Sequence, residues 1–233
     1  MLELTFSPKD GLRSHGRGRD SPLHILCLGA HSDDIEIGAG GTVLTLLHQF
    51  PGSHVTWVVC AADGVRESEA LASATELLAD AGSLDTRLLG LRESYFNVGP
   101  DAKDAFEELK ASLGRGPDVI VTHCLHDRHQ DHETVARLTW NTWRDNVLLE
   151  YEIPKYEGDL RTPNVYVPLP EQIVDRKLDH LAHHFHSQHD KNWYDGDTFR
   201  GLMRIRGVEC QSPTKFAEAF HGRKLVLGLG ASY

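Results

Sequence analysis

The sequence predicts an α/β fold: a Rossmann-like, doubly wound, mostly parallel sheet with helices on both faces, in a single domain. Short apolar runs alternate four times with longer segments whose apolar residues recur at helical spacing. Repeated strand-helix units of this kind are typical of a parallel sheet that helices cover on both faces. The length of 233 residues suits one large domain.

Four strand-helix units follow one another along the first two thirds of the chain. Strands are predicted at 24–28, 55–60, 86–89 and 118–122, and helices at 35–50, 67–81, 103–113 and 133–149. Pro51-Gly52 ends the first helix and Gly82 ends the second, because these residue types stop helices.

The regular alternation ends after residue 149. A proline-containing stretch at 150–170 is expected to form a long excursion within the same domain. Beyond it we predict helices at 171–186 and 198–207 and a terminal strand at 224–227. Residues 1–22 are expected to form an N-terminal arm, which leaves 23–233 as the domain.

The commonest strand order of such a sheet, 3-2-1-4, places the first and fourth strands side by side. Ligands bind there, at the carboxyl ends of the strands, because the winding direction reverses at that point. The loops that leave these two strands lie at 29–34 and 123–131. We therefore expect the two loops to meet in space.

Composition excludes several classes of partner. Lys and Arg total 24 and Asp and Glu total 34, so the net charge is −10, which disfavours binding to nucleic acid or anionic lipid. No apolar run approaches the ~18–20 residues that cross a bilayer. The first twenty residues lack the apolar core of a secretory signal, so a cytoplasmic protein is expected.

The two loops carry the side chains best suited to bind a metal ion. His31-Ser32-Asp33-Asp34 follows the first strand, and His129-Gln130-Asp131-His132 opens the helix after the fourth strand. Alone, either tetrad also fits a helix cap or solvated histidines, because the chain contains 15 His. Together they offer the two imidazoles and one carboxylate of a hydrolytic zinc site. A non-haem iron site uses the same ligand types, so Fe²⁺ and other divalent metals remain alternatives.

These residues resemble the PIG-L/LmbE family of zinc-dependent deacetylases, which act on N-acetylglucosamine-type sugars. The resemblance is carried by the segments 26–42, 66–69, 89–91, 127–132, 186–188 and 217–220, and so spans most of the chain. The segments 139–145 and 150–155 look like one bacterial branch of that family.

The resemblance implies one zinc ion per chain with three ligands, His31, Asp34 and His132. It further implies that Asp33 is the general base, that His129 steadies the oxyanion and protonates the amine, and that Asp131 orients His129. These roles agree with the chemistry of amide hydrolysis. An amide is a poor electrophile with a poor leaving group, so its hydrolysis needs an activated water, a stabilised oxyanion and a proton for nitrogen.

The resemblance also implies substrate contacts around this site. Arg66 follows the second strand and is expected to hydrogen-bond substrate hydroxyls or phosphate, although an exposed pairing with Glu69 explains it equally well. Glu93 stands where many relatives have Asp and is expected to contact the sugar. His186 is expected to line the pocket, whereas four nearby histidines, His180, His183, His184 and His189, are expected to be solvated or packed against the surface.

The sequence therefore predicts a hydrolase that removes an N-acetyl group from an N-acetylglucosamine-type sugar or conjugate, a small-molecule substrate. It is compatible with a homo-oligomer. The alternative is a zinc amidase that acts on a non-sugar N-acyl substrate. A metal-binding module without hydrolysis is disfavoured, because Asp33 and His129 are both present.

A nucleotide-binding oxidoreductase is the rival that the fold suggests. It is disfavoured because the first strand-to-helix turn lacks G-x-G-x-x-G and carries two carboxylates where a pyrophosphate would bind. Gly38, Gly40 and Gly41 lie inside the following helix, where we expect them to allow close packing on the sheet.

Overall fold

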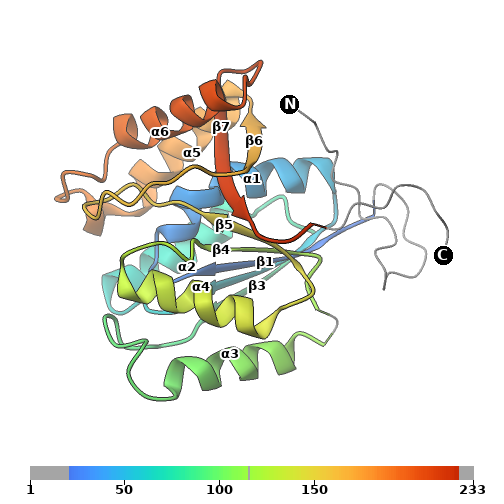
Figure 1. Cartoon of the computed structure of the whole chain (residues 1–233), viewed down its shortest axis with the longest axis vertical. Coiled ribbons are helices and arrows are strands. Elements are labelled where there is room, and N and C mark those ends of the chain that lie inside the picture. The colour runs from blue at the N-terminus through green and yellow to red at the C-terminus, as the bar shows by residue number, and fades with distance from the viewer. Residues whose placement is uncertain (1–20, 115, 226–233) are drawn as a thin grey trace.

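The computed structural model describes residues 21–114 and 116–225, which form one seven-stranded sheet with helices around it (Figure 1). The strands are β1 (His24–Gly29), β2 (His54–Val59), β3 (Ser83–Leu88), β4 (Val119–His123), β5 (Val147–Tyr151), β6 (Val165–Leu169) and β7 (Phe216–Gly222). The helices are α1 (Asp34–Gln49), α2 (Val65–Leu77), α3 (Asp101–Ser112), α4 (Gln130–Thr142), α5 (Glu171–His184) and α6 (Gly196–Glu209), with a short 3-10 helix at His186–Gln188.

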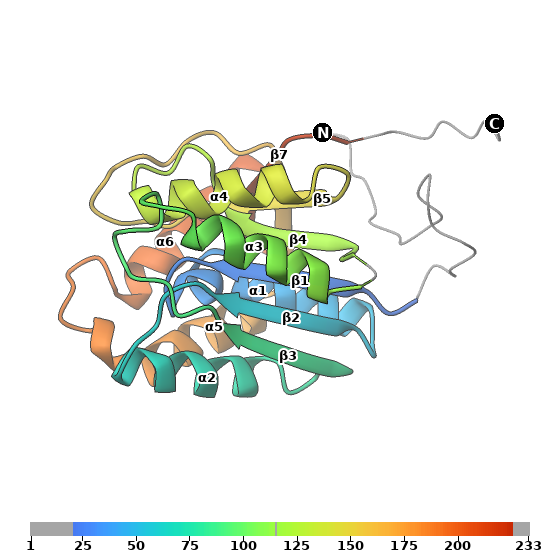
Figure 2. The ribbon, with the colours of Figure 1, turned by 90° about the horizontal axis from the view of Figure 1, so that it is seen from below.

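The strand order is β3-β2-β1-β4-β5-β7-β6, which contains the predicted 3-2-1-4 arrangement. The first five strands in this order are parallel, as Figure 2 shows for β3, β2, β1 and β4, whereas β7 runs antiparallel to both β5 and β6. Strands β1 and β4 are hydrogen-bonded neighbours, with Ile25 opposite Val119. The winding direction therefore reverses between β1 and β4, as predicted.

Helices cover both faces of the sheet, because successive side chains of a buried strand point to opposite faces. Ile25 and Cys27 of β1 belong to the core that includes residues of α1, α2 and α5, whereas Leu26 and Leu28 belong to the core under α3 and α4. The doubly wound α/β fold expected from the sequence is thus confirmed. Helix α6 lies beside α5 and β7, at the end of the molecule opposite α3 (Figure 1).

Two glycines let α1 lie close to the sheet. A Cβ atom at Gly38 would collide with the ring of Tyr151, and one at Gly41 would lie 2.6 Å from Leu169 Cδ1. At Gly40 the nearest atom would be Lys177 Cγ at 3.9 Å, which is an ordinary contact. The expected packing role is therefore confirmed for Gly38 and Gly41 but not for Gly40.

The predicted helix at 133–149 is wrong beyond residue 142. Helix α4 ends at Thr142, and the residues predicted as its last turn belong to β5, next to β4. The error arose because Leu148 and Leu149 continue the apolar spacing of the helix, while the intervening segment Trp143–Asn146 holds no Gly or Pro to mark the break.

The C-terminal strand also lies elsewhere than predicted. The strand found near the C-terminus is β7, which begins eight residues before the expected strand at 224–227. Lys224 and Leu225 lie in no strand, and residues 226 and 227 are outside the described part of the chain. Strand β7 was not predicted, because the charged residue Glu218 interrupts its apolar run. This carboxylate is buried because it pairs with Lys177 Nζ at 2.6 Å and accepts the N–H groups of Gly41 and Thr42.

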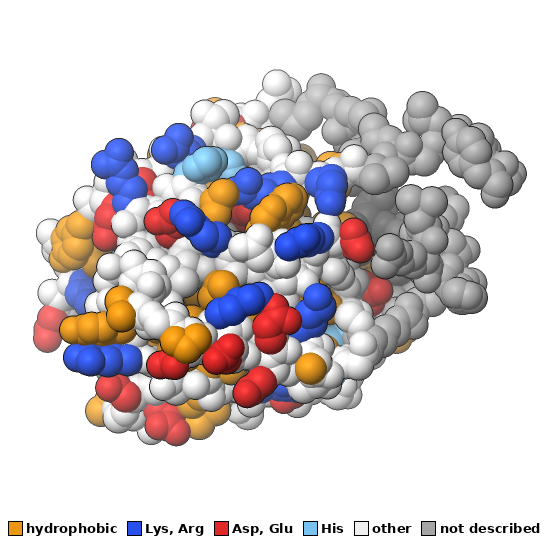
Figure 3. Space-filling model, turned by 60° about the horizontal axis from the view of Figure 1, so that its bottom comes forward, with side chains coloured by type: hydrophobic (Ala, Val, Ile, Leu, Met, Phe, Trp, Pro, Cys, Tyr) orange, Lys and Arg blue, Asp and Glu red, His pale blue; other side chains and the backbone are white. Residues whose placement is uncertain are grey.

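Within the 150–170 excursion the structure contains β6, which adds an edge strand to β7. Most of the N-terminal arm predicted at 1–22 lies outside the described residues. Among the helices of the described ranges, none combines the length and apolar character needed to cross a bilayer. On the side where α3 and α4 lie, Figure 3 shows acidic and basic side chains interspersed with single apolar ones, as on an ordinary solvated surface.

Candidate metal and catalytic site

The loops after β1 and β4 meet at the carboxyl end of the sheet, as the strand order predicts. His31 comes from the first loop and His132 from the first turn of α4, and the side chains of both are buried. His31 Nδ1 lies 3.2 Å from His132 Nε2, although the two residues are 101 positions apart. Asp34 at the start of α1 is also buried and lies close to both rings.

The donor atoms of these three residues have the spacing of a metal site. Asp34 Oδ2 lies 3.4 Å from His31 Nδ1, and Asp34 Oδ1 lies 3.5 Å from His132 Nε2. Tetrahedral coordination with bonds of about 2.0–2.1 Å puts neighbouring ligand atoms about 3.3 Å apart. The three separations, 3.2, 3.4 and 3.5 Å, are close to this value, with Asp34 reaching His31 through Oδ2 and His132 through Oδ1.

A carboxylate holds the other nitrogen of each imidazole. His132 Nδ1 lies 2.8 Å from Asp127 Oδ2, and His31 Nε2 lies 3.3 Å from Asp131 Oδ2. A carboxylate that accepts the outer N–H of a histidine fixes its tautomer and turns the other nitrogen toward the metal. The pair of carboxylates therefore prepares His31 Nδ1 and His132 Nε2 as donors on the side of Asp34.

Two of the three residues, His132 and Asp34, are in the ionisation state that metal binding requires. Burial lowers the pKa of His132 to about 3, so this ring is neutral. Burial alone would raise the pKa of Asp34, but the neighbouring His132 and His123 hold it well below its usual value. Burial would lower the pKa of His31, yet its hydrogen bonds to Asp131 and Asp34 raise it to about 10. A metal ion that binds to His31 must therefore displace a proton.

Asp33 is the residue before α1 and is buried. It occupies the N-cap position, yet its side chain makes no capping hydrogen bond, so the carboxylate is not engaged in stabilising the start of the helix. Burial and the adjacent charge of Asp34 raise the pKa of Asp33 to about 6, which lies near the value that suits a general base at neutral pH.

His129 is the N-cap residue of α4, and its ring lies beside the rings of His132 and His31. Its Nδ1 accepts a hydrogen bond from the backbone N–H of Asp131, so the neutral ring carries its proton on Nε2. Burial and the charge of His31 lower the pKa of His129. Asp131 was expected to orient His129, but in the structure its carboxylate contacts His31 and not the ring of His129.

Arg66 and Glu93, two of the residues expected to contact the substrate, form an ion pair at the edge of the cluster, which we call the rim. Arg66 Nη1 lies 2.8 Å from Glu93 Oε2, and Arg66 Nε donates to Ser32 Oγ at 3.3 Å. The pairing of Arg66 with Glu69 that the sequence also allowed does not occur; Glu69 is buried and accepts hydrogen bonds from Ser187. Arg66 and Glu93 thus stand together at the edge of the cluster, with Glu93 Oε1 3.9 Å from His31 Nε2.

A strained backbone position supports this rim. Ser94 has φ 67°, in the left-handed region that non-glycine residues rarely adopt, and its N–H donates to Asp131 Oδ2 at 2.7 Å. The carbonyl of Ser94 accepts from the side chain of Gln130 at 2.8 Å. These bonds tie the Glu93 loop to the first turn of α4.

His186, the third expected substrate residue, is exposed in the 3-10 helix after α5. Its ring neighbours are His183 and His189, with centroids 6.4 Å and 5.0 Å away, and the next residue, Ser187, bonds to Glu69. His186 therefore belongs to a surface group of histidines beyond the cluster formed by His31 and its neighbours.

Four residues around the cluster were given no role from the sequence. Asp127 supports His132, and its other oxygen lies 2.9 Å from Lys155 Nζ, which comes from the 150–170 excursion. His123, the last residue of β4, has its Nε2 3.1 Å from Asp34 Oδ2, and its ring stacks on that of His132. A polar residue at the end of a buried strand and the D-x-H-x-D-H spacing were the available signals. Asp159 of the excursion also accepts the N–H of Arg128, so this segment braces the loop.

The fold is shared by several solved structures. The 4-carboxy-2-hydroxymuconate hydratase GalB from Pseudomonas putida superposes with a TM-score of 0.71 at 15% identity, over 90% of this chain and 100% of that chain. The N,N'-diacetylchitobiose deacetylase from Pyrococcus horikoshii gives 0.63 at 17% identity, over 86% and 84%. A deacetylase in the biosynthesis pathway of teicoplanin gives 0.61 at 12% identity, over 85% and 95%. At these identities the likeness concerns the fold.

Family membership rests on the sequence itself. Residues 26–143 match the PIG-L family model, described as GlcNAc-PI de-N-acetylase. The match covers half of the chain, runs from β1 into the residue after α4, and includes both tetrads that form the cluster. The family expected from the sequence is confirmed: the chain belongs to the PIG-L family.

Proposed function

We propose that this protein is a zinc-dependent deacetylase that removes the N-acetyl group from an N-acetylglucosamine-type amino sugar or its conjugate. Membership in a family of de-N-acetylases supports deacetylation as the reaction. The observation that carries the proposal is the convergence of His31, Asp34 and His132, in which each pair of residues has donor atoms within 3.5 Å of each other.

These three side chains would hold one zinc ion, because two imidazoles and a carboxylate leave a coordination position open for water or substrate. A bound zinc ion supplies a water of lowered pKa, near 7, and polarises the carbonyl of the amide. Asp127 and Asp131 would keep the two rings in the required orientation through the hydrogen bonds described above. Asp131 would thus orient His31, whereas the sequence led us to expect that it orients His129.

Asp33 would act as the general base. Its carboxylate is buried next to the ligand Asp34 and is not used for helix capping. A pKa raised to about 6 leaves it largely ionised at neutral pH and still basic enough to accept a proton from water. The proton taken by Asp33 is the one that the attacking water must lose.

His129 would stabilise the oxyanion and deliver a proton to the leaving amine. Its backbone hydrogen bond at Nδ1 leaves Nε2–H as the free donor, and its ring lies 4.5 Å from that of His132 between centroids. A donor held in place before the reaction stabilises developing negative charge without reorganisation. To supply the proton that the amine leaving group requires, the ring would have to carry a second proton, and the proton that Asp33 takes from the attacking water balances this transfer.

The ion pair of Arg66 and Glu93 supports the proposed substrate class. Arg66 and Glu93 together present a guanidinium and a carboxylate, which can donate and accept hydrogen bonds to vicinal hydroxyls of a sugar. A non-sugar N-acyl amide would use the same cluster but would leave this ion pair without a polyhydroxylated partner. We therefore assign an N-acetyl sugar as substrate and the zinc amidase of non-sugar substrates as the second candidate.

The test is an acetate-release assay on protein stripped of metal and reconstituted with zinc. The substrates are N-acetylglucosamine, N,N'-diacetylchitobiose and GlcNAc-PI, with an N-acetylated amino acid as the non-sugar control. Acetate release from a sugar substrate, abolished by chelation and restored by zinc, is expected. Release from the amino acid alone would favour the amidase. Hydration of 4-carboxy-2-hydroxymuconate without acetate release from any substrate would overturn deacetylation.

A further inference from the structure

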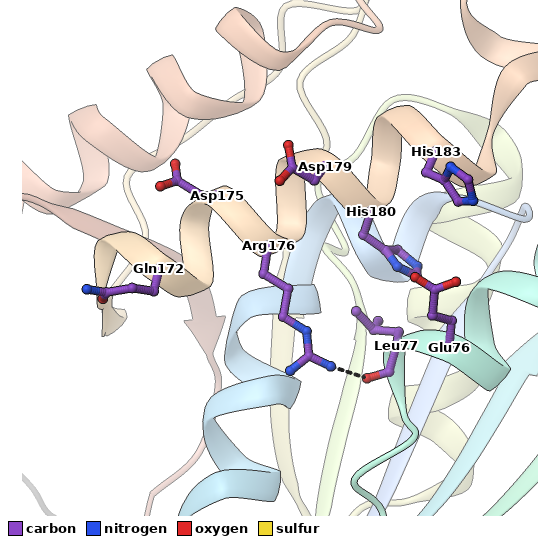
Figure 4. A pocket seen from close by; sticks show the side chains of 8 residues that line it. All are labelled: Glu76, Leu77, Gln172, Asp175, Arg176, Asp179, His180 and His183. Carbon is purple, nitrogen blue, oxygen red and sulfur yellow. Dashed lines mark hydrogen bonds between the residues drawn. The ribbon is translucent and has the colours of Figure 1, made fainter.

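A second group of metal-binding side chains lies between α2 and α5, apart from the cluster around His31. His180 and His184 belong to α5 and Glu76 to α2. His184 Nε2 lies 3.1 Å from Glu76 Oε2, and one donor atom from each of the three residues lies within 4.8 Å of the others. Figure 4 shows His180 and Glu76 facing each other from their two helices.

The spacing of the histidines is suited to a single ion. Residues four positions apart on a helix stand on the same face, and two histidines with this spacing form one edge of many helical zinc sites. Glu76 adds a carboxylate from the neighbouring helix. We propose that Glu76, His180 and His184 form a second site for a divalent transition-metal ion such as zinc, which links α2 to α5.

A hydrogen-bond chain prepares His180 as a ligand. His180 Nε2 forms a 2.8 Å hydrogen bond with Ser73 Oγ, which in turn is hydrogen-bonded to Glu36 Oε1. Nδ1 is then the ring nitrogen left for a metal ion. The ring is thus held by an outer partner at one nitrogen, in the same way as a metal-ligating histidine whose second nitrogen is fixed.

His184 and Glu76 complete the donor set with different mobility. The Nε2 atom of His184 is buried and has no hydrogen-bond partner in the described structure, only the ion pair with Glu76. The side chain of Glu76 is 64% exposed, so its carboxylate can shift by the small distance needed for tetrahedral ligand spacing of about 3.3 Å. Two buried histidines and an exposed carboxylate can therefore converge on an incoming ion.

A cavity of about 750 Å³ gives an ion access to this group. Its lining includes His180, His183 and three carboxylates, Glu76, Asp175 and Asp179, against one guanidinium, that of Arg176. The lining thus has a net charge of 1 − 3 = −2 with neutral histidines, which attracts a cation. Arg176 points one nitrogen toward the carbonyl of Leu77, as Figure 4 shows, and another toward Asp80.

The experiment counts zinc ions on the full-length protein. Metal-free wild type, Glu76→Gln, His184→Ala and His183→Ala are titrated with zinc, and bound zinc per chain is measured by native mass spectrometry. His183→Ala is the matched control, because it removes an imidazole from the same cavity and helix but leaves the three proposed ligands. Melting temperatures of the metal-free forms verify that each variant is folded.

Wild type and His183→Ala are expected to bind one more zinc ion per chain than Glu76→Gln and His184→Ala. The difference of one equivalent is independent of how many ions the cluster around His31 takes, so the result stands apart from the proposed deacetylase activity. The zinc-dependent rise in melting temperature should likewise be smaller in His184→Ala than in His183→Ala. Equal zinc counts in wild type and in both ligand variants would overturn the second site.

Discussion

His132 Nδ1 and Asp127 Oδ2 are 2.8 Å apart, and the second oxygen of Asp127 lies 2.9 Å from Lys155 Nζ. This relationship links a proposed ligand to a segment that the sequence left without a role. The side chain of Lys155 is almost fully buried and restrains the carboxylate through the oxygen that His132 does not contact. The orientation of one imidazole therefore depends on a side chain more than twenty positions away in the chain.

Asp127→Asn is expected to weaken zinc binding about 10–100-fold, because an amide neither accepts as strongly nor fixes the His132 tautomer as a carboxylate does. Competition with a chromogenic chelator measures the affinity. Gln130→Ala, on the exposed side of the same turn, is the control and should change the affinity little. An unchanged zinc affinity in Asp127→Asn would contradict the supporting role.

Asp33→Asn is expected to retain zinc but to lose about 10²–10⁴-fold in kcat, the usual contribution of a positioned general base. The side chain keeps its size while losing its basicity. Zinc content and acetate release are measured on the same preparation. His132→Ala is the comparison variant, since it should lose the metal together with the activity. Normal turnover by Asp33→Asn would remove Asp33 from the mechanism.

Arg66→Ala is expected to raise KM for the proposed sugar substrate more than it lowers kcat, because in our proposal the guanidinium contacts a part of the substrate that does not react. Glu93→Gln should have a similar but smaller effect, since it breaks the ion pair while keeping a hydrogen-bonding side chain. Steady-state kinetics separate the two constants. A loss confined to kcat would place Arg66 at the reacting bond instead of the rim.

Glu36 predicts a pH dependence of stability. Burial raises its pKa from an ordinary value near 4.5 to about 8. Between these two values the unfolded chain has lost the proton that the folded protein keeps, so this residue's contribution to stability falls as pH rises through the window. The full loss is on the order of a few kcal/mol. Glu36→Gln lacks the titrating group.

The measurement is urea unfolding of metal-free wild type and Glu36→Gln at several values between pH 5 and 8. The free energy of unfolding of the variant relative to wild type should increase with pH. A constant difference across this range would show that Glu36 has the same pKa in both states.

Gly38→Ala is expected to destabilise the protein by about 1–3 kcal/mol, because the new Cβ would overlap the buried ring of Tyr151. Gly40→Ala, two positions away in the same helix, is the matched control. It meets nothing closer than 3.9 Å and should stabilise by up to about 1 kcal/mol through helix propensity. Thermal and urea unfolding distinguish the opposite signs, and equal effects would refute the packing role of Gly38.

The sequence was sufficient to predict the fold class and the central strand order, because four buried strands alternate with helices in a regular way. It failed where this regularity ends. Leu148 and Leu149 of β5 continue the apolar spacing of the preceding helix. Strand β7 contains the charged residue Glu218, which is buried because Lys177 of α5 pairs with it. Tertiary partners, and not local patterns, decide these two elements.

The same distinction applies to the site. Meeting of the two tetrads could be predicted, because topology alone brings the ends of β1 and β4 together. The partner of the Asp131 carboxylate could not be predicted, since the choice between His31 and His129 depends on side-chain directions in the first turn of α4. The assignments of His31, Asp34 and His132 to zinc, and of Arg66, Glu93 and His186 to the substrate, stay predictions for the experiments above.

The distance of 101 positions between His31 and His132 also has a consequence for biosynthesis. No nascent chain that ends before β4 and α4 have emerged from the ribosome can bring these two imidazoles together. Such long-range parallel pairing forms slowly compared with local helices. A metal ion could thus bind to the proposed site only once the central sheet is complete. Chains that end before α4 would lack the site.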